Sequence, residues 1–428
     1  MINRLRRFLP QSHFGRNVAV LMSGTIFAQA IPILISPILT RLYSPDSFGS
    51  FALFISIATL LSMVATGKYD FAVMVAKEDP DARTLVVLVV LLSVVFSVGL
   101  WLVGLYWGQD LFSLLNTTVP YDPLWVGLLP MTVMILAMYQ ASYVYINRCG
   151  AYKCISLSQG GQAIVTSAAN IGLGWTRDSY YYLIVSKLLG LLSSIVILQS
   201  AFGSVRAFIA PVSWPSLWGL ARRYVNFPKL SLPADMLSQV AADLPIYMLI
   251  ALYGDASAGL YALSLRVVGV PLTIIGSAVQ NVFRQEAAAY YSQHGECQRI
   301  YIRTFKVLAG LSLFPFLALG LLAVPLFGFI FGEQWVAAGE MTQIMIIMYY
   351  FKFIAGPLSY MYFIAEQQKE DLYLHVYIVL SSFILIYLGH VYYHNVIYSL
   401  AFYALNYTGI YLYVLVRCYQ FSKGNGKK

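Results

Sequence analysis

The chain contains twelve apolar stretches, each long enough to cross a lipid bilayer, and together they occupy nearly all of its 428 residues. A transmembrane helix needs about 20 mostly apolar residues to cross a hydrocarbon core of roughly 30 Å. Charged residues make up only 11% of the chain, against about a quarter of a soluble domain. The sequence therefore predicts an all-α polytopic membrane protein with about twelve transmembrane helices.

The predicted spans are placed by the length and the limits of each apolar stretch. In the first half they are Val18 to Leu39, Phe48 to Thr66, Thr84 to Trp107, Leu124 to Ile146, Cys154 to Gly174 and Tyr180 to Ser200. In the second half they are Ala234 to Tyr253, Ala258 to Val282, Phe305 to Phe331, Met341 to Ala365, Leu372 to Gly389 and Val396 to Val416. The connecting segments are too short to hold a soluble domain.

The distribution of lysine and arginine predicts the orientation. With the basic segment before Arg16 on the cytosolic side, the connections alternate between the two faces of the membrane. Only Arg41 and Arg177 of the 27 basic residues then fall outside, while Lys187, Arg266 and Lys352 fall within helices and the rest lie inside. This pattern obeys the positive-inside rule, so we expect both termini in the cytosol. The net charge of +9 then reflects topology and not nucleic-acid binding.

The two halves of the chain carry an internal repeat. At an offset of 210 positions, residues 42–53 align with residues 252–263 without a gap and with six identical positions. We therefore expect an N-terminal six-helix lobe over residues 1–205 and a C-terminal six-helix lobe over residues 231–428. Residues 206–230 should form a cytosolic, amphipathic linker at the membrane interface, because they contain Trp214, Trp218, Arg222, Arg223 and Tyr224. Transporters with parallel repeats bind substrate between the halves, near the bilayer midplane.

Three basic residues within the spans are candidate substrate ligands, since ionisable groups in a membrane are costly and usually functional. From a rise of 1.5 Å per residue, Lys187 and Arg266 lie roughly 10 to 12 Å from the outer ends of their helices and Lys352 roughly 17 Å. At this common depth they predict a cationic cavity for an anion such as a phosphate or pyrophosphate. The alternative is a set of structural ion pairs, for example between Asp243 and Lys187 or Arg266.

A polar face on the seventh span adds further candidates. Asp235, Gln239 and Asp243 recur every four residues and so share one side of the helix. We expect this face to line the cavity, and Asp243 could alternatively bind a coupling proton or cation.

Motifs for catalysis are missing from the sequence. There is no phosphate-binding Gly-rich loop with Lys-Ser/Thr, no paired-histidine zinc motif and no serine elbow. The four cysteines fall in or beside cytosolic segments without metal-site spacing. The chain is thus predicted to be a transporter without metal or cofactor. A membrane glycosyltransferase or polymerase is the rival class, but its loops would need more charged residues than the segment from Gly108 to Pro123 contains.

Several phrases resemble a known family. The stretch from Pro37 to Gly49 (PILTRLYSPDSFG) and the stretch from Gly67 to Ala72 (GKYDFA) are similar to the N-terminal signature of bacterial polysaccharide flippases. Residues 227–234 (FPKLSLPA) and 259–266 (GLYALSLR) resemble the region of helices 7 and 8 in the same family. These flippases are Wzx-like members of the MATE-like (MOP) transporter superfamily.

The resemblance implies a function and further site residues. It implies that the chain moves a polyprenyl-pyrophosphate-linked oligosaccharide, such as an O-antigen or exopolysaccharide unit, from the cytosolic to the periplasmic leaflet of the inner membrane. Arg41, Tyr69, Asp70 and Arg266 match family motif positions. Alternatively, Arg41 is an interfacial anchor and Tyr69-Asp70 a helix cap. A polysaccharide polymerase and a chain-length regulator are possible partners, a proton or sodium ion could provide coupling, and a MATE-type drug or cation antiporter is the nearest alternative.

Overall fold

The computed structural model describes residues 13–114, 123–200 and 212–424. Within these ranges every regular element is a helix. The chain divides into two compact units, one of residues 1–43 and 51–239 and the other of residues 44–50 and 240–428. The basic residues before His13, residues 115–122 of the predicted outer loop and the start of the predicted linker lie outside the described ranges.

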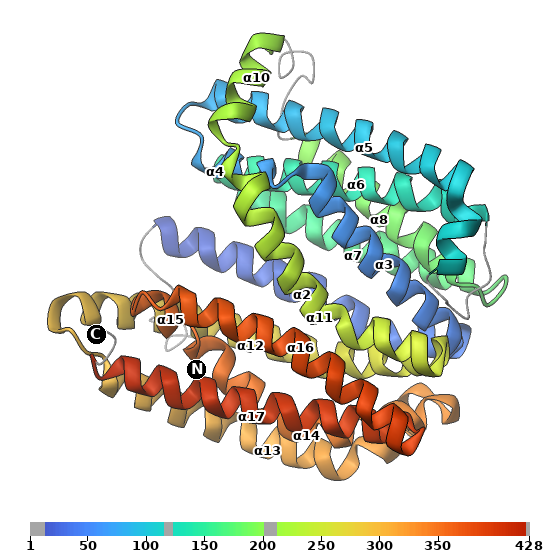
Figure 1. Cartoon of the computed structure of the whole chain (residues 1–428), viewed down its shortest axis with the longest axis vertical. Helices are drawn as coiled ribbons and strands as arrows, with labels where there is room; N and C mark the ends of the chain where they lie inside the picture. Colours follow the sequence, from blue (N-terminus) through green and yellow to red (C-terminus); the bar gives the residue numbers. More distant parts are fainter. Residues whose placement is uncertain (1–12, 115–122, 201–211, 425–428) are drawn as a thin grey trace. The chain divides into compact units, whose positions relative to one another are not determined.

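The first unit is a bundle of long helices (Figure 1). In it α2 packs on α7, α7 on α8, and α5 on α6, while the short helix α4 packs on α5 and α6. Its elements are α2 (His13–Leu42), α3 (Pro45–Thr66, from Phe51), α4 (Tyr69–Val75), α5 (Asp79–Leu114), α6 (Pro123–Arg148), α7 (Tyr152–Gly174), α8 (Tyr180–Ser200), α10 (Trp214–Arg223), η2 (Phe227–Ser231) and the start of α11 (Leu232–Tyr253).

The second unit is built around α14, which packs on α12, α13 and α17, and α17 in turn packs on α16. The helices that follow α11 are α12 (Asp255–His294), α13 (Gln298–Phe331), η3 (Glu333–Trp335), α14 (Val336–Leu358), α15 (Met361–Ile364), α16 (Gln368–Tyr393) and α17 (Val396–Ser422). A buried cluster of α12, α13, α14 and α17 side chains forms much of its core.

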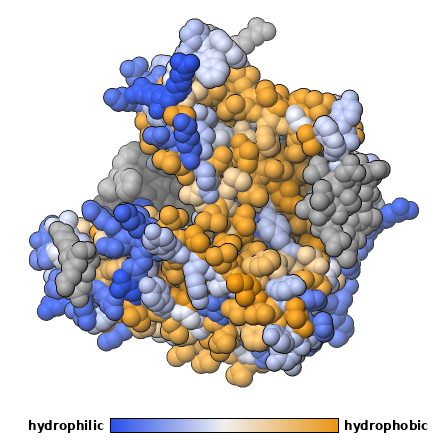
Figure 2. Space-filling view, in the orientation of Figure 1, coloured by the Kyte–Doolittle hydropathy of each residue, from blue (hydrophilic) through white to orange (hydrophobic). Residues whose placement is uncertain are grey.

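The number of membrane spans agrees with the sequence. Eleven helices in the described residues are long and apolar enough to cross a membrane. The remaining predicted span is α7, which has 23 residues but carries several serine, threonine, glutamine and asparagine side chains. About twelve transmembrane helices is therefore confirmed. Apolar residues dominate much of the face seen in Figure 2, as expected of a surface covered by lipid.

The repeat is visible in the structure. Helices α3 and α12 begin at Pro45 and Asp255, which are 210 positions apart, as the repeat predicts. The two helices contact each other at Gly49 and Gly259, which are equivalent positions of the repeat. A Cβ on Gly49 would lie 1.9 Å from the Asp255 carbonyl oxygen, and one on Gly259 would lie 1.8 Å from that of Pro45. Only glycine allows two helix backbones to approach this closely.

Helix α10 has the amphipathic character predicted for the linker. Ser213 caps it, since its hydroxyl accepts a hydrogen bond from the Ser216 amide. Within the first unit α10 packs on α5; its Leu217 is buried, while Trp214 and Trp218, one turn apart, are exposed. An exposed tryptophan pair on a short helix is typical of a membrane interface. The lobe and linker limits given from the sequence stay a prediction.

Candidate functional site

Two of the predicted basic residues line one cavity in the second unit. Arg266 lies on α12, two turns after Gly259, and Lys352 lies on α14, six residues before its end at Leu358. The cavity has a volume of about 700 Å³. It is lined by Ala262, Leu265, Arg266, Gly269, Leu272, Thr273, Gly276, Ser277, Gln280, Lys352, Phe353, Gly356 and Pro357.

A polar stripe on α12 forms one wall of this cavity. Arg266, Thr273, Ser277 and Gln280 recur at intervals of three, four and seven residues, so they lie on one side of the helix. The sequence analysis did not select Thr273, Ser277 or Gln280. Their spacing from Arg266 could have indicated that they share its helix face. Uncharged polar residues are common in transmembrane helices, however, so they do not by themselves indicate a binding site.

The electrostatic character of the cavity is positive. None of the described residues that line it is acidic, and neither Arg266 nor Lys352 has a carboxylate within ion-pair distance in the described part of the chain. The Arg266 guanidinium lies 5.6 Å from the ring centre of Phe48, which is a cation–π contact. Within the described residues, both basic side chains therefore face this cavity without a carboxylate partner.

Small residues leave room beside the cations. Gly269 and Gly276 on α12 and Gly356 on α14 all line the cavity. A Cβ on Gly276 would reach no atom closer than 3.9 Å, and one on Gly356 would meet nothing within 4 Å. The cavity can thus hold a ligand with an anionic group at Arg266 and Lys352 and hydroxyl groups facing Thr273, Ser277 and Gln280.

The other predicted ligands lie elsewhere. Lys187 is on α8 of the first unit and does not line this cavity. Asp243 and Gln239 are half-buried on α11 and also do not line it. Arg41 is exposed in the last turn of α2, which fits an interfacial anchor. Their contribution to substrate binding stays a prediction.

The turn between α3 and α4 holds a second cluster of charges, in the first unit. The Lys68 ammonium lies 2.9 Å from a carboxylate oxygen of Asp235, in the first turn of α11. Asp70 is 2% exposed, and burial raises the pKa of its carboxyl while the nearby Lys68 opposes that effect. The Tyr69 hydroxyl donates a hydrogen bond of 3.0 Å to the Ala221 carbonyl of α10. Tyr69 and Asp235 thus hold helices together at this turn.

Metal binding has no support in the described residues, where no group of three or more histidine, cysteine or carboxylate side chains could hold an ion. His390 and His394, four residues apart, have ring centres 5.5 Å from each other.

Comparison with known proteins gives one family and one fold. The family model described as polysaccharide biosynthesis protein matches residues 38–340. No curated protein matches the sequence. The lipid II flippase MurJ in an inward closed conformation superposes with a TM-score of 0.70 at 12% identity, covering 94% of this chain and 90% of that one.

Two transporters give similar results. An inward-facing multidrug resistance MATE family transporter of the MOP superfamily has a TM-score of 0.63 at 13% identity, with 94% and 96% of the two chains covered. A MOP superfamily transporter from Pyrococcus furiosus, noted for the reverse polarity of its binding pocket, has a TM-score of 0.61 at 14% identity, with 95% and 96% covered. At these identities the likeness shows the fold, and the predicted MATE-like architecture is confirmed.

Proposed function

We propose, from the premise that this chain belongs to the family of polysaccharide biosynthesis proteins, that it is a flippase for polyprenyl-pyrophosphate-linked oligosaccharides. It carries the repeat unit of a surface polysaccharide, such as O-antigen, from the cytosolic to the periplasmic leaflet of the inner membrane. The observation that carries this proposal is the cavity in which Arg266 and Lys352 stand without any acidic residue among the described lining residues.

The chemistry of the cavity fits the polar part of such a lipid. The forked guanidinium of Arg266 can donate two hydrogen bonds to phosphate oxygens, and the Lys352 ammonium adds a point charge. Thr273, Ser277 and Gln280 offer donors and acceptors to sugar hydroxyls along the same wall. Each hydrogen bond to a charged group contributes about 1.5 to 3 kcal/mol, so the pair can retain a pyrophosphate without covalent chemistry.

The internal repeat supports an alternating-access cycle. In that cycle the cavity accepts the head group from the cytosolic leaflet and releases it to the periplasmic one, while the lipid chain stays in the membrane. We infer that both termini are cytosolic, as the positive-inside distribution predicts, and that a polymerase and a chain-length regulator act on the product. A proton or sodium gradient can supply the energy, and no chemical step by the protein is needed.

A drug or cation antiporter is the competing function for this fold. A cavity that selects cations needs carboxylates to attract them, and the described lining residues of the cavity contain two cations instead. The charge at the site therefore favours an anionic substrate.

The proposal is tested by deleting the gene in its host and measuring on which leaflet the lipid-linked oligosaccharide accumulates. We expect accumulation on the cytosolic leaflet and loss of surface polymer, both restored by the wild-type gene. The double variant Arg266→Gln with Lys352→Gln should fail to restore either, whereas Lys306→Gln, an exposed cation on α13 outside the cavity, should restore both. Normal polymer in the deletion strain, with a new sensitivity to cationic drugs, would refute the flippase and support the antiporter.

A further inference from the structure

The first turn of α3 belongs to the second unit and packs there through Phe48. The ring of Phe48 lies edge-to-face with that of Trp335, with ring centres 5.1 Å apart. The Arg266 guanidinium lies over the same Phe48 ring, 5.6 Å from its centre. Phe48 is 3% exposed and Trp335 is fully buried. Phe48 is therefore held between a buried tryptophan and one of the two cations of the cavity.

The close approach of α3 and α12 explains this contact. The backbones of the two helices meet at Gly49, the residue after Phe48, and at Gly259, and Arg266 follows two turns later on α12. Side chains on a helix lean toward its N-terminal end, so the long arginine side chain reaches back toward Phe48. Phe48 is not among the described residues that line the cavity. Its ring thus contacts the guanidinium without filling space that a ligand would take.

The first unit contains the repeat equivalent of this aromatic pair. Trp125 lies 210 positions before Trp335 and is therefore its equivalent in the repeat. Trp125 lies edge-to-face with Phe54, also on α3, with ring centres 5.0 Å apart, and both side chains are buried. The repeat equivalent of Arg266, however, is the uncharged Ser56. The arginine beside the aromatic pair is thus a feature of the second half of the repeat, where the cationic cavity lies.

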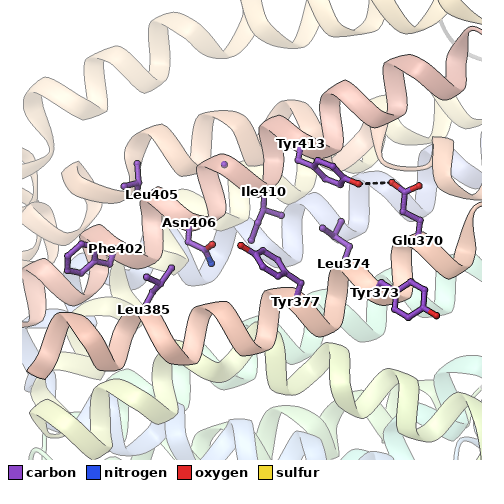
Figure 3. A pocket seen from close by; sticks show the side chains of 11 residues that line it. Glu370, Tyr373, Leu374, Tyr377, Leu385, Phe402, Leu405, Asn406, Ile410 and Tyr413 are labelled. Atoms are coloured by element: carbon purple, nitrogen blue, oxygen red, sulfur yellow. Dashed lines mark hydrogen bonds between the residues drawn. The ribbon is translucent and has the colours of Figure 1, made fainter.

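An aromatic ring and a carboxylate act differently on an arginine. At the pocket between α16 and α17, Glu370 accepts a hydrogen bond from the Tyr413 hydroxyl (Figure 3). Arg417 binds both oxygens of the same carboxylate, at 2.6 and 2.7 Å, so its charge is neutralised and its forked donors are engaged. A ring attracts a cation through its quadrupole and leaves the in-plane N–H donors to other groups. The contact with Phe48 can therefore fix the direction of the Arg266 guanidinium without neutralising it.

We propose that Phe48 is a positioning residue for the anionic head group of the substrate. Its ring is held in place by Trp335 and fixes the direction of the Arg266 guanidinium, so that the forked donors of that group meet the phosphate oxygens. An arginine without this support would lose side-chain freedom when the anion binds, and that loss weakens binding. The inference rests on the proposed function, because it needs an anionic group in the cavity.

Fluorination of the Phe48 ring tests this proposal with little change in the size of the side chain. Fluorine withdraws electron density from the ring face and so weakens its attraction for a cation. The probe is inorganic pyrophosphate, titrated by calorimetry into the purified full-length protein in detergent. When Phe48 is replaced by mono-, di- and trifluorophenylalanine, the dissociation constant should rise stepwise, to about tenfold for the last, since ordering one long side chain weakens binding by this order.

The matched control is the same series of replacements at Phe54. This residue lies on the same helix and has the equivalent edge-to-face contact with Trp125, but the repeat equivalent of the arginine is a serine there. We expect the Phe54 series to bind pyrophosphate like the wild type. The difference between the two series then isolates the contact of the ring with Arg266 from its contact with tryptophan.

Two results would overturn the proposal while leaving the anion site in place. One is a dissociation constant that fluorination of Phe48 leaves unchanged or lowers. The other is an equal rise for the Phe54 series, which would assign the effect to packing on tryptophan. Absence of pyrophosphate binding by the wild type would remove the anion site itself, and the proposal with it. A failure of the flippase function is distinct from these results, because it is measured as leaflet accumulation in cells.

Discussion

Replacing Gly259 with alanine should separate α12 from the start of α3. The new Cβ would lie 1.8 Å from the Pro45 carbonyl oxygen, whereas ordinary contact begins at 3.4 Å. The two backbones would have to part by about 1.6 Å, and since the obstacle is backbone it cannot rotate away as a side chain could. Overpacking typically costs 1 to 3 kcal/mol, and we expect about 3 kcal/mol here.

The assay is thermal unfolding of the purified protein in detergent. A loss of about 3 kcal/mol should lower the unfolding midpoint by a few degrees. The matched control is Gly310→Ala, where nothing lies within 4 Å, and which should be neutral or stabilising, because alanine favours a helix over glycine by up to about 1 kcal/mol. Gly49→Ala should behave like Gly259→Ala.

The double variant of Gly49 and Gly259 sharpens this prediction. Both methyl groups would be accommodated by the same separation of α3 and α12, so the loss should be clearly smaller than the sum of the two single losses. If Gly259→Ala were as stable as Gly310→Ala, or if the two single losses were fully additive, the close contact of the repeat-related helices would be refuted.

Further predictions concern the charges at the turn between α3 and α4. Lys68→Met should lower the free energy of unfolding by about 1 to 3 kcal/mol, because it leaves the half-exposed Asp235 without its ion-pair partner beside a buried site. The control is Arg83→Met, which breaks the exposed ion pair with Asp79. It should lower the free energy of unfolding by less than about 1 kcal/mol in the same assay. Burial raises the pKa of the Asp70 carboxyl, so the folded protein binds a proton at Asp70 more tightly than the unfolded chain does. The stabilisation from the protonated Asp70 is therefore lost as the pH rises from about 3.9, the pKa of an unfolded Asp, through the raised pKa of the folded state. Asp70→Asn should therefore show a flatter fall of unfolding midpoint across that pH window, and an unchanged slope would contradict the raised pKa.

Much of the fold could be predicted from the sequence, because length and apolarity alone identify a membrane span. Helix α8 has the predicted limits, Tyr180 to Ser200. Helix α12 extends beyond the predicted end at Val282 to His294, since polar residues after the apolar run continue the helix outside the hydrocarbon layer. Such extensions carry no hydropathy signal.

The site was predictable only in part. Depth along each helix placed Arg266 and Lys352 at a common level, and the structure brings both into one cavity. The depth of a residue in the membrane does not show which way its side chain faces. The sequence therefore could not decide whether Lys187 lines the same cavity as Arg266 and Lys352. The ion pair of Lys68 with Asp235 joins residues that are far apart in the sequence. The spacing of Asp235 and Asp243 predicts that they share one face of a helix, but it does not predict which basic residue Asp235 binds.

The central claim is that the cavity of Arg266 and Lys352 carries an anionic lipid-linked sugar. Its most direct test is transport by the purified protein in sealed vesicles, in which a fluorescent polyprenyl-pyrophosphate oligosaccharide becomes protected from a reagent added outside. We expect transfer by the wild type and by Lys352→Arg, and loss of transfer in Arg266→Gln with Lys352→Gln, with no uptake of a cationic dye by any of them. Transfer by the doubly neutralised variant equal to that of the wild type, or uptake of the dye in place of the lipid, would contradict the account.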